Sequence, residues 1–112
     1  MIFTGQDNKT VFVAPIYQGS NPSIWFEVLD GVTGIHITLT GRTIDIILQA
    51  IKTNTALEVV DDQNATLRIE DTKEGSTLFE TSVVGEDVYH KCTVSRETAI
   101  KIKEYIDELL RK

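Results

Sequence analysis

The chain has 112 residues, 41% of them hydrophobic and 25% charged, which is the composition of one soluble globular domain. Its formal net charge of −6 disfavours tight non-specific association with nucleic acid or an anionic membrane. The single cysteine, Cys92, excludes an internal disulfide and suits a reducing compartment. No signal peptide and no apolar stretch of about 20 residues is present, so we expect a cytoplasmic protein with no membrane segment.

The first half begins with signals for β-strands. Pro15 falls within the second expected strand, which places that position at a sheet edge or a bulge. A dense turn cluster over residues 18–23 comes next, and the later pair Asp30-Gly31 is a hairpin signal. Alternation in the fourth strand puts His36 and Thr38 on the face opposite its isoleucines. The strands expected in this half are Met1–Thr4, Thr10–Tyr17, Ser23–Leu29 and Gly34–Leu39.

A helix is expected to follow the fourth strand. Thr40 is a suitable N-cap, because its hydroxyl can accept from the free amides of the first turn. The apolar stripe of this helix consists of Ile44, Ile47, Leu48 and Ile51. Ile46 lies off that stripe, so the helix is apolar on more than one side. Two interpretations stay open: burial on two sides within the fold, or an oligomer interface that includes Ile46.

The second half repeats this order of elements. The strands expected here are Ala56–Val60, Thr66–Glu70, Ser76–Val84 and Val88–Val94. Alternation in the second of them points Leu67 inward and Arg68 outward. The final helix is expected to begin after Ser95 as N-cap, with Glu97 at the positive end of its dipole. Its apolar face consists of Ala99, Ile102, Ile106 and Leu109.

The two halves also align with each other. Residues 38–51 match residues 93–106, and Phe26-Glu27 recurs as Phe79-Glu80. A fixed period in a short chain indicates duplicated supersecondary units that share one core. We therefore expect a single domain over residues 1–112, with pseudo-repeats at about 1–54 and 55–112. The predicted fold class is α+β: a duplicated β-β-β-β-α unit whose antiparallel sheets pack on two helices.

Motifs for catalysis and metal binding are absent from the sequence. There is no glycine-rich phosphate loop, no His-Glu-x-x-His and no Cys-x-x-Cys. Cys92 is at an inward strand position and is expected to be a small buried hydrophobe. His36 and His90 occupy nearly equivalent points of the repeats, but alternation puts them on different faces. The pairs Asp61-Asp62 and Glu86-Asp87 are typical of turns. We expect no cofactor, no metal and no enzymatic activity.

Aromatic and basic side chains are expected on the outward faces of the strands. An exposed sheet face with rings beside cations suits single-stranded nucleic acid, because bases stack on rings and cations neutralise phosphates. The predicted nucleic-acid-binding residues are Trp25, His36, Arg68, Tyr89 and Lys91. The other interpretation is that these residues cover a second packing surface.

A resemblance supports the first interpretation. Residues 34–40 (Gly-Ile-His-Ile-Thr-Leu-Thr), followed by an amphipathic helix, resemble the end of the single-stranded DNA-binding domain of transcriptional positive cofactor four. Doubling of such a unit within one chain resembles the Whirly family, whose fold is four strands and a helix, repeated. The resemblance implies DNA binding on the outward sheet face at the five residues named above. It also implies pairing of copies through their helices.

Two functions from different classes follow. The first is a non-catalytic single-stranded nucleic-acid-binding protein, of phage or bacterial origin, that works as a homo-oligomer. The alternative is an acidic protein-interaction module, such as an inhibitor or an assembly subunit, that does not bind nucleic acid. The charge deficit and the nearly uncharged, apolar first half favour this alternative. An enzyme whose site is assembled from scattered residues is a third possibility.

Overall fold

A computed structural model of the chain describes residues 1–18 and 21–111, with the backbone alone described at residues 17, 18 and 21. The first repeat contains β1 (Ile2–Thr4), the 3-10 turn η1 (Gln6–Asn8), β2 (Lys9–Gln18), β3 (Asn21–Asp30), β4 (Thr33–Thr40) and α1 (Gly41–Thr53). The second contains β5 (Leu57–Val60), β6 (Ala65–Asp71), β7 (Ser76–Val83), β8 (Tyr89–Ser95) and α2 (Arg96–Leu110).

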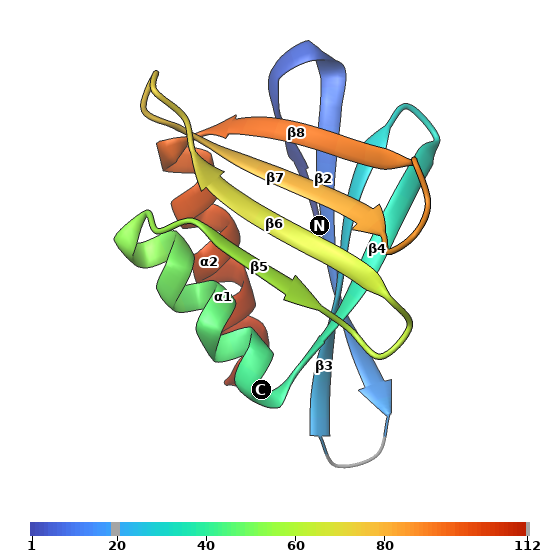
Figure 1. Cartoon of the computed structure of the whole chain (residues 1–112). Helices are drawn as coiled ribbons and strands as arrows, with labels where there is room; N and C mark the ends of the chain where they lie inside the picture. Colours follow the sequence, from blue (N-terminus) through green and yellow to red (C-terminus); the bar gives the residue numbers. More distant parts are fainter. Residues whose placement is uncertain (19–20, 112) are drawn as a thin grey trace.

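The strands form two antiparallel sheets of four strands, each in chain order. The first sheet holds β1 to β4 and the second holds β5 to β8, and one helix follows each sheet. The strands of the second sheet cross those of the first, and α1 and α2 lie side by side (Figure 1). The predicted α+β class and the duplicated β-β-β-β-α unit are therefore confirmed.

One core lies between the two sheets and the two helices. The rings of Phe26 in β3 and Phe79 in β7 have centroids 5.4 Å apart, and neither side chain is exposed. The helices add Ile44, Ile47, Leu48 and Ile51 from α1 and Ala99, Ile102 and Ile106 from α2. Both repeats thus cover one shared apolar interior, which is the packing expected of a duplicated unit.

Pro15 lies on a free sheet edge. The register of β2 with β3 is continuous across the Pro15–Ile24 pair, so there is no bulge at this position. β1 pairs only with Thr10–Phe12, which leaves the later part of β2 without a strand on its outer side. Proline is tolerated there because a free edge makes no use of the missing N–H.

The two helices begin differently. Thr40 is the N-cap of α1 as predicted, but its side chain makes no capping hydrogen bond, so that part of the prediction is wrong. The helix begins with Gly41 at φ +46°, a left-handed conformation that glycine adopts readily. Ser95 caps α2 in the regular way, because its Oγ accepts from the Thr98 N–H at 3.1 Å.

An arginine at the start of α2 forms hydrogen bonds with the end of α1. Nη2 of Arg96, the first residue of α2, donates to the carbonyl oxygens of Ile51 and Lys52, the latter at 3.1 Å. These carbonyls belong to the last turn of α1, where the only other donor to Ile51 among the described residues is the Asn54 N–H, at a long 3.4 Å. A cation at this negative end of the helix dipole is favourable. The start of the second helix therefore satisfies the end of the first.

Cys92 is buried, as predicted. Its neighbour Gly5 packs so closely on β8 that an added Cβ would lie 2.6 Å from the carbonyl oxygen of Thr93. Burial raises the pKa of the Cys92 thiol to about 11, against smaller lowering effects of the Lys9 charge and the Gly5 N–H. The thiol is thus protonated and shielded, which fits a packing role rather than a reactive one.

Within the described part of the chain, neither helix combines the length and the apolar character needed to cross a bilayer.

Candidate functional site

The five predicted binding residues lie on two separate surfaces. Trp25 and His36 project from the outer face of the first sheet, because each alternates with a buried neighbour in its strand. Arg68, Tyr89 and Lys91 project in the same way from the second sheet. The inner faces of the sheets pack on one core, so the outer faces point away from each other. The structure does not gather the five residues on one face.

On the second sheet, the cations are paired with carboxylates. Glu80 lies 3.4 Å from Nε of Arg68 and 3.5 Å from Nζ of Lys91. Glu70 also lies 3.4 Å from Arg68. Nζ of Lys91 is 5.1 Å from the centre of the Tyr89 ring, which is 59% exposed. A ring does lie beside a cation here, as predicted, but two carboxylates already balance the two cations.

On the first sheet, the two aromatic residues stack on each other. The Trp25 and His36 rings are 3.7 Å apart and tilted by only 7°. They come from neighbouring strands, since Trp25 pairs with Thr38 and Glu27 pairs with His36. Nε1 of Trp25 donates to Oε1 of Glu27 at 3.2 Å. The indole is therefore fixed in place by a ring on one face and a carboxylate at its polar edge.

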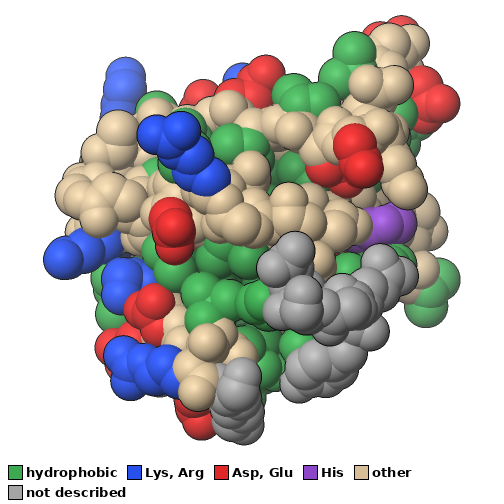
Figure 2. Space-filling view, turned by 90° about the horizontal axis from the view of Figure 1, so that it is seen from below, with side chains coloured by type: hydrophobic (Ala, Val, Ile, Leu, Met, Phe, Trp, Pro, Cys, Tyr) green, Lys and Arg blue, Asp and Glu red, His purple; other side chains and the backbone are tan. Residues whose placement is uncertain are grey.

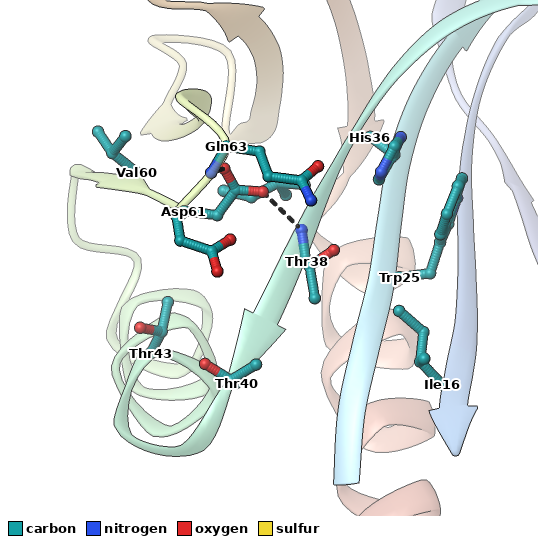
Figure 3. Close-up of a pocket in the computed structure, with 11 residues that line it drawn as sticks. Ile16, Trp25, His36, Thr38, Thr40, Thr43, Val60, Asp61 and Gln63 are labelled. Carbon is teal, nitrogen blue, oxygen red and sulfur yellow. Dashed lines mark hydrogen bonds between the residues drawn. The ribbon is translucent and has the colours of Figure 1, made fainter. Parts of the chain in front are cut away.

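A cleft of about 540 Å³ opens beside this stack, and we call it the Trp25 cleft. Trp25 and His36 form one side of it, and Asp61, Asp62 and Gln63 of the β5–β6 turn form another. Thr40 and Thr43 line it from the start of α1, as Figure 3 shows. The volume is in the usual range for ligand sites. Both repeats contribute side chains, so neither would form this cleft alone.

Asp61 joins the two repeats at the cleft. Its Oδ1 accepts from the backbone N–H groups of Gln63 and Ala65, both at 2.9 Å, which is the turn role that the sequence indicated. Its Oδ2 accepts from the Thr38 N–H at 3.1 Å (Figure 3). Thr38 lies on β4, the edge strand of the first sheet, so Asp61 satisfies a donor that has no neighbouring strand. The sequence carries no signal for this contact.

The Trp25 cleft is acidic. Asp62 is exposed, and within the described residues it makes no ion pair or side-chain hydrogen bond. No lysine or arginine is found among the described residues that line the cleft. In the view of Figure 2, lysine and arginine side chains gather on the left with carboxylates among them, whereas carboxylates and a histidine, but no lysine or arginine, are seen on the right. Such a cleft attracts cations and repels phosphates.

The two histidines do not occupy matching positions. His36 pairs with Glu27, and the residue that pairs with the equivalent Glu80 is Lys91. His90 lies one residue earlier, on the inward face, where its Nε2 is buried with no hydrogen-bond partner. Among residues 1–18 and 21–111, no three His, Cys, Asp or Glu side chains come together in a way that could hold a metal ion.

Ile46 lies on the outside of α1, with 40% of its surface exposed. Burial of the helix on two sides within the fold is therefore wrong for this residue. It borders a shallow groove of about 300 Å³. The groove is lined by Ile46, Gln49, Ala50, Thr53, Thr55, Ala56 and Leu57. The oligomer interface at Ile46 stays a prediction.

Comparison of the sequence with protein-family models and with curated proteins finds no match. The resemblance to the Whirly family accordingly stays a prediction that rests on residues 34–40 and the repeated unit.

Proposed function

We propose that this chain is a non-catalytic protein-interaction module that holds a basic segment of a partner protein in the Trp25 cleft. The observation that supports the proposal is the cleft itself. A stacked pair of rings faces two adjacent carboxylates, and no cation is found among the described lining residues. Aromatic rings and carboxylates are the two kinds of group that attract Lys and Arg side chains.

The same geometry gives less support to single-stranded nucleic acid. Phosphates need cations that are free to approach them. On the second sheet, Arg68 and Lys91 share Glu80, and on the first sheet the stack of Trp25 and His36 shares its cleft with Asp61 and Asp62. A base that stacked on His36 would bring its phosphates close to these carboxylates. Nucleic-acid binding remains the alternative against which the proposal is tested.

The expected affinity is modest. An exposed ion pair contributes about 0.2–1 kcal/mol, and a cation over a ring contributes about 0.5–1 kcal/mol. Several basic side chains must act together to reach micromolar binding, which is near −8 kcal/mol. Because the cleft is open to solvent, binding should weaken as salt rises above about 0.15 M.

The sequence supplies a local probe, since Trp25 is the only tryptophan. We would titrate the protein at low salt with a nine-residue peptide that contains both Arg and Lys, and follow Trp25 fluorescence. A saturable change is expected for the basic peptide. A peptide with Glu at the same positions should give no change, and neither should a single-stranded oligonucleotide.

A matched pair of variants separates the cleft from overall charge. Asp62→Asn removes a charge inside the cleft, and Asp71→Asn removes the same charge at the far end of β6. The first should weaken peptide binding at least threefold and the second by much less, because the cleft contact is direct. Equal effects of the two variants would show non-specific attraction to an acidic protein. Binding of the oligonucleotide in place of the peptide would favour the nucleic-acid function.

A further inference from the structure

We infer that the residue recognised in the Trp25 cleft is an arginine of the partner, a proposal that rests on the function proposed above. The geometry of His36 carries it. One face of the imidazole lies on the Trp25 ring at 3.7 Å, nearly parallel to it. In Figure 3, His36 lies between Trp25 and the Asp61–Gln63 side of the cleft. A flat group that enters the cleft can extend the stack from two rings to three layers.

The oxygen atoms around the cleft suit a donor with many N–H groups. Both carboxylate oxygens of Asp61 are occupied by backbone N–H groups, whereas Asp62 has neither an ion pair nor a side-chain hydrogen bond within the described residues. Asp62 is thus the acceptor for an incoming cation. The Gln63 amide and the hydroxyls of Thr40 and Thr43 line the same space and provide further acceptors.

Arginine meets both requirements, and lysine meets one. The guanidinium is planar, stacks on aromatic rings, and presents five N–H donors in a fork that fits a carboxylate. The lysine ammonium is a compact, strongly hydrated charge that can approach Asp62 but cannot stack. Stacking on the face of His36 is therefore the contact that distinguishes the two side chains.

The test uses three peptides that differ at one central position among glycines and serines: arginine, lysine or citrulline. Citrulline keeps the planar shape without the charge. Trp25 fluorescence is followed up to millimolar peptide. The arginine peptide should bind about three to five times more tightly than the lysine peptide, and the citrulline peptide should bind least.

Two variants at His36 test the stacking step. His36→Ala removes the ring, and the preference for arginine over lysine should fall to about one. His36→Phe restores a flat surface, and the preference should return. Circular dichroism of each variant confirms that the fold is kept. A merely structural role of His36 would change the affinity for both peptides by the same factor and leave the ratio unchanged.

The outcomes separate this inference from the proposed function. Equal binding of arginine and lysine peptides, both weakened by Asp62→Asn, would overturn arginine recognition and leave the interaction module intact. A preference for arginine that survives His36→Ala would also overturn the inference. No binding of any basic peptide, or binding that Asp62→Asn leaves unchanged, would overturn both.

Discussion

The outer faces of the two sheets carry the same carboxylate in different surroundings. In the second sheet, Glu80 lies in a cross-strand row between Arg68 and Lys91. In the first sheet, the equivalent Glu27 lies in a row between Phe12 and His36. The glutamate is present in both repeats, but its cross-strand neighbours differ. They are two cations in the second sheet and two aromatic residues in the first. The second face satisfies its own charges, whereas the first leaves an acidic, aromatic surface beside a cleft.

This difference indicates that the duplicated unit shares its interior and differs in its exterior. Inward positions hold Phe26 and Phe79 at matching places in one core. Outward positions are free to differ, because a change there does not disturb the packing that holds both repeats together. The second face is a closed network of ion pairs, and the first is the face on which we propose that the partner binds.

The largest expected effect concerns the shared core. Phe26→Ala and Phe79→Ala should each lower the free energy of unfolding by about 3–5 kcal/mol, because both rings are fully buried. The double variant should differ from the sum of the single effects, since the two rings are in contact. Urea unfolding followed by circular dichroism and by Trp25 fluorescence would measure this. Two separate transitions would show that the repeats unfold independently, and Val32→Ala, at a residue 99% exposed, is the control.

The next effect is a dependence of stability on pH. It is expected from Cys92 in β8 and not from Ile37, its counterpart in β4, because only the cysteine has a titratable group. The folded thiol has a pKa of about 11 against an ordinary value of 9.0, so the fold favours the protonated form. This contribution is complete below pH 9 and is lost as pH rises toward 11. The loss should be about 2–3 kcal/mol, because each pH unit between the two pKa values costs about 1.36 kcal/mol. We would measure the free energy of unfolding of wild type and of Cys92→Ala from pH 8 to 11. The difference between the two proteins should fall as pH rises, and a constant difference would contradict the prediction.

A smaller effect distinguishes the two helix starts. Arg96→Ala removes the donor to two carbonyls of α1 and should cost about 2 kcal/mol, within the range for hydrogen bonds from charged groups. Arg42→Ala is the matched control, because Arg42 lies at the positive end of α1 and is exposed. It should change the stability by less than about 0.5 kcal/mol. Thermal unfolding of the two variants gives the comparison, and equal shifts would argue against a capping role for Arg96.

The smallest effect tests the two carboxylates directly. Glu80→Gln leaves two cations without their shared partner and should cost about 1 kcal/mol, with less effect in high salt. Glu27→Gln should cost less, because an amide oxygen can still accept from the Trp25 indole. Urea midpoints at two salt concentrations would measure both variants. A larger cost at Glu27 than at Glu80 would reverse the comparison between the faces.

The sequence by itself determined the elements and their inward faces. Alternation with period two located the strands, the spacing of isoleucines located α1 and α2, and the repeat predicted two equivalent units around one core. It also placed Trp25 and His36 outward and Cys92 inward. These features were readable because each depends on residues within a few positions of one another, and burial imposes a fixed period on them.

The tertiary structure decided the candidate site. The bond between Asp61 and Thr38 spans 23 residues, and the contact of Arg96 with Ile51 spans 45. Such contacts have no local pattern, since they depend on how the two sheets cross and where a turn of one repeat meets the edge of the other. For the same reason the five outward residues do not share a surface, although alternation places all of them outward. Two lie on the outer face of the first sheet and three on the outer face of the second. Period two tells which side of a strand a residue is on, but only packing determines what lies across from it.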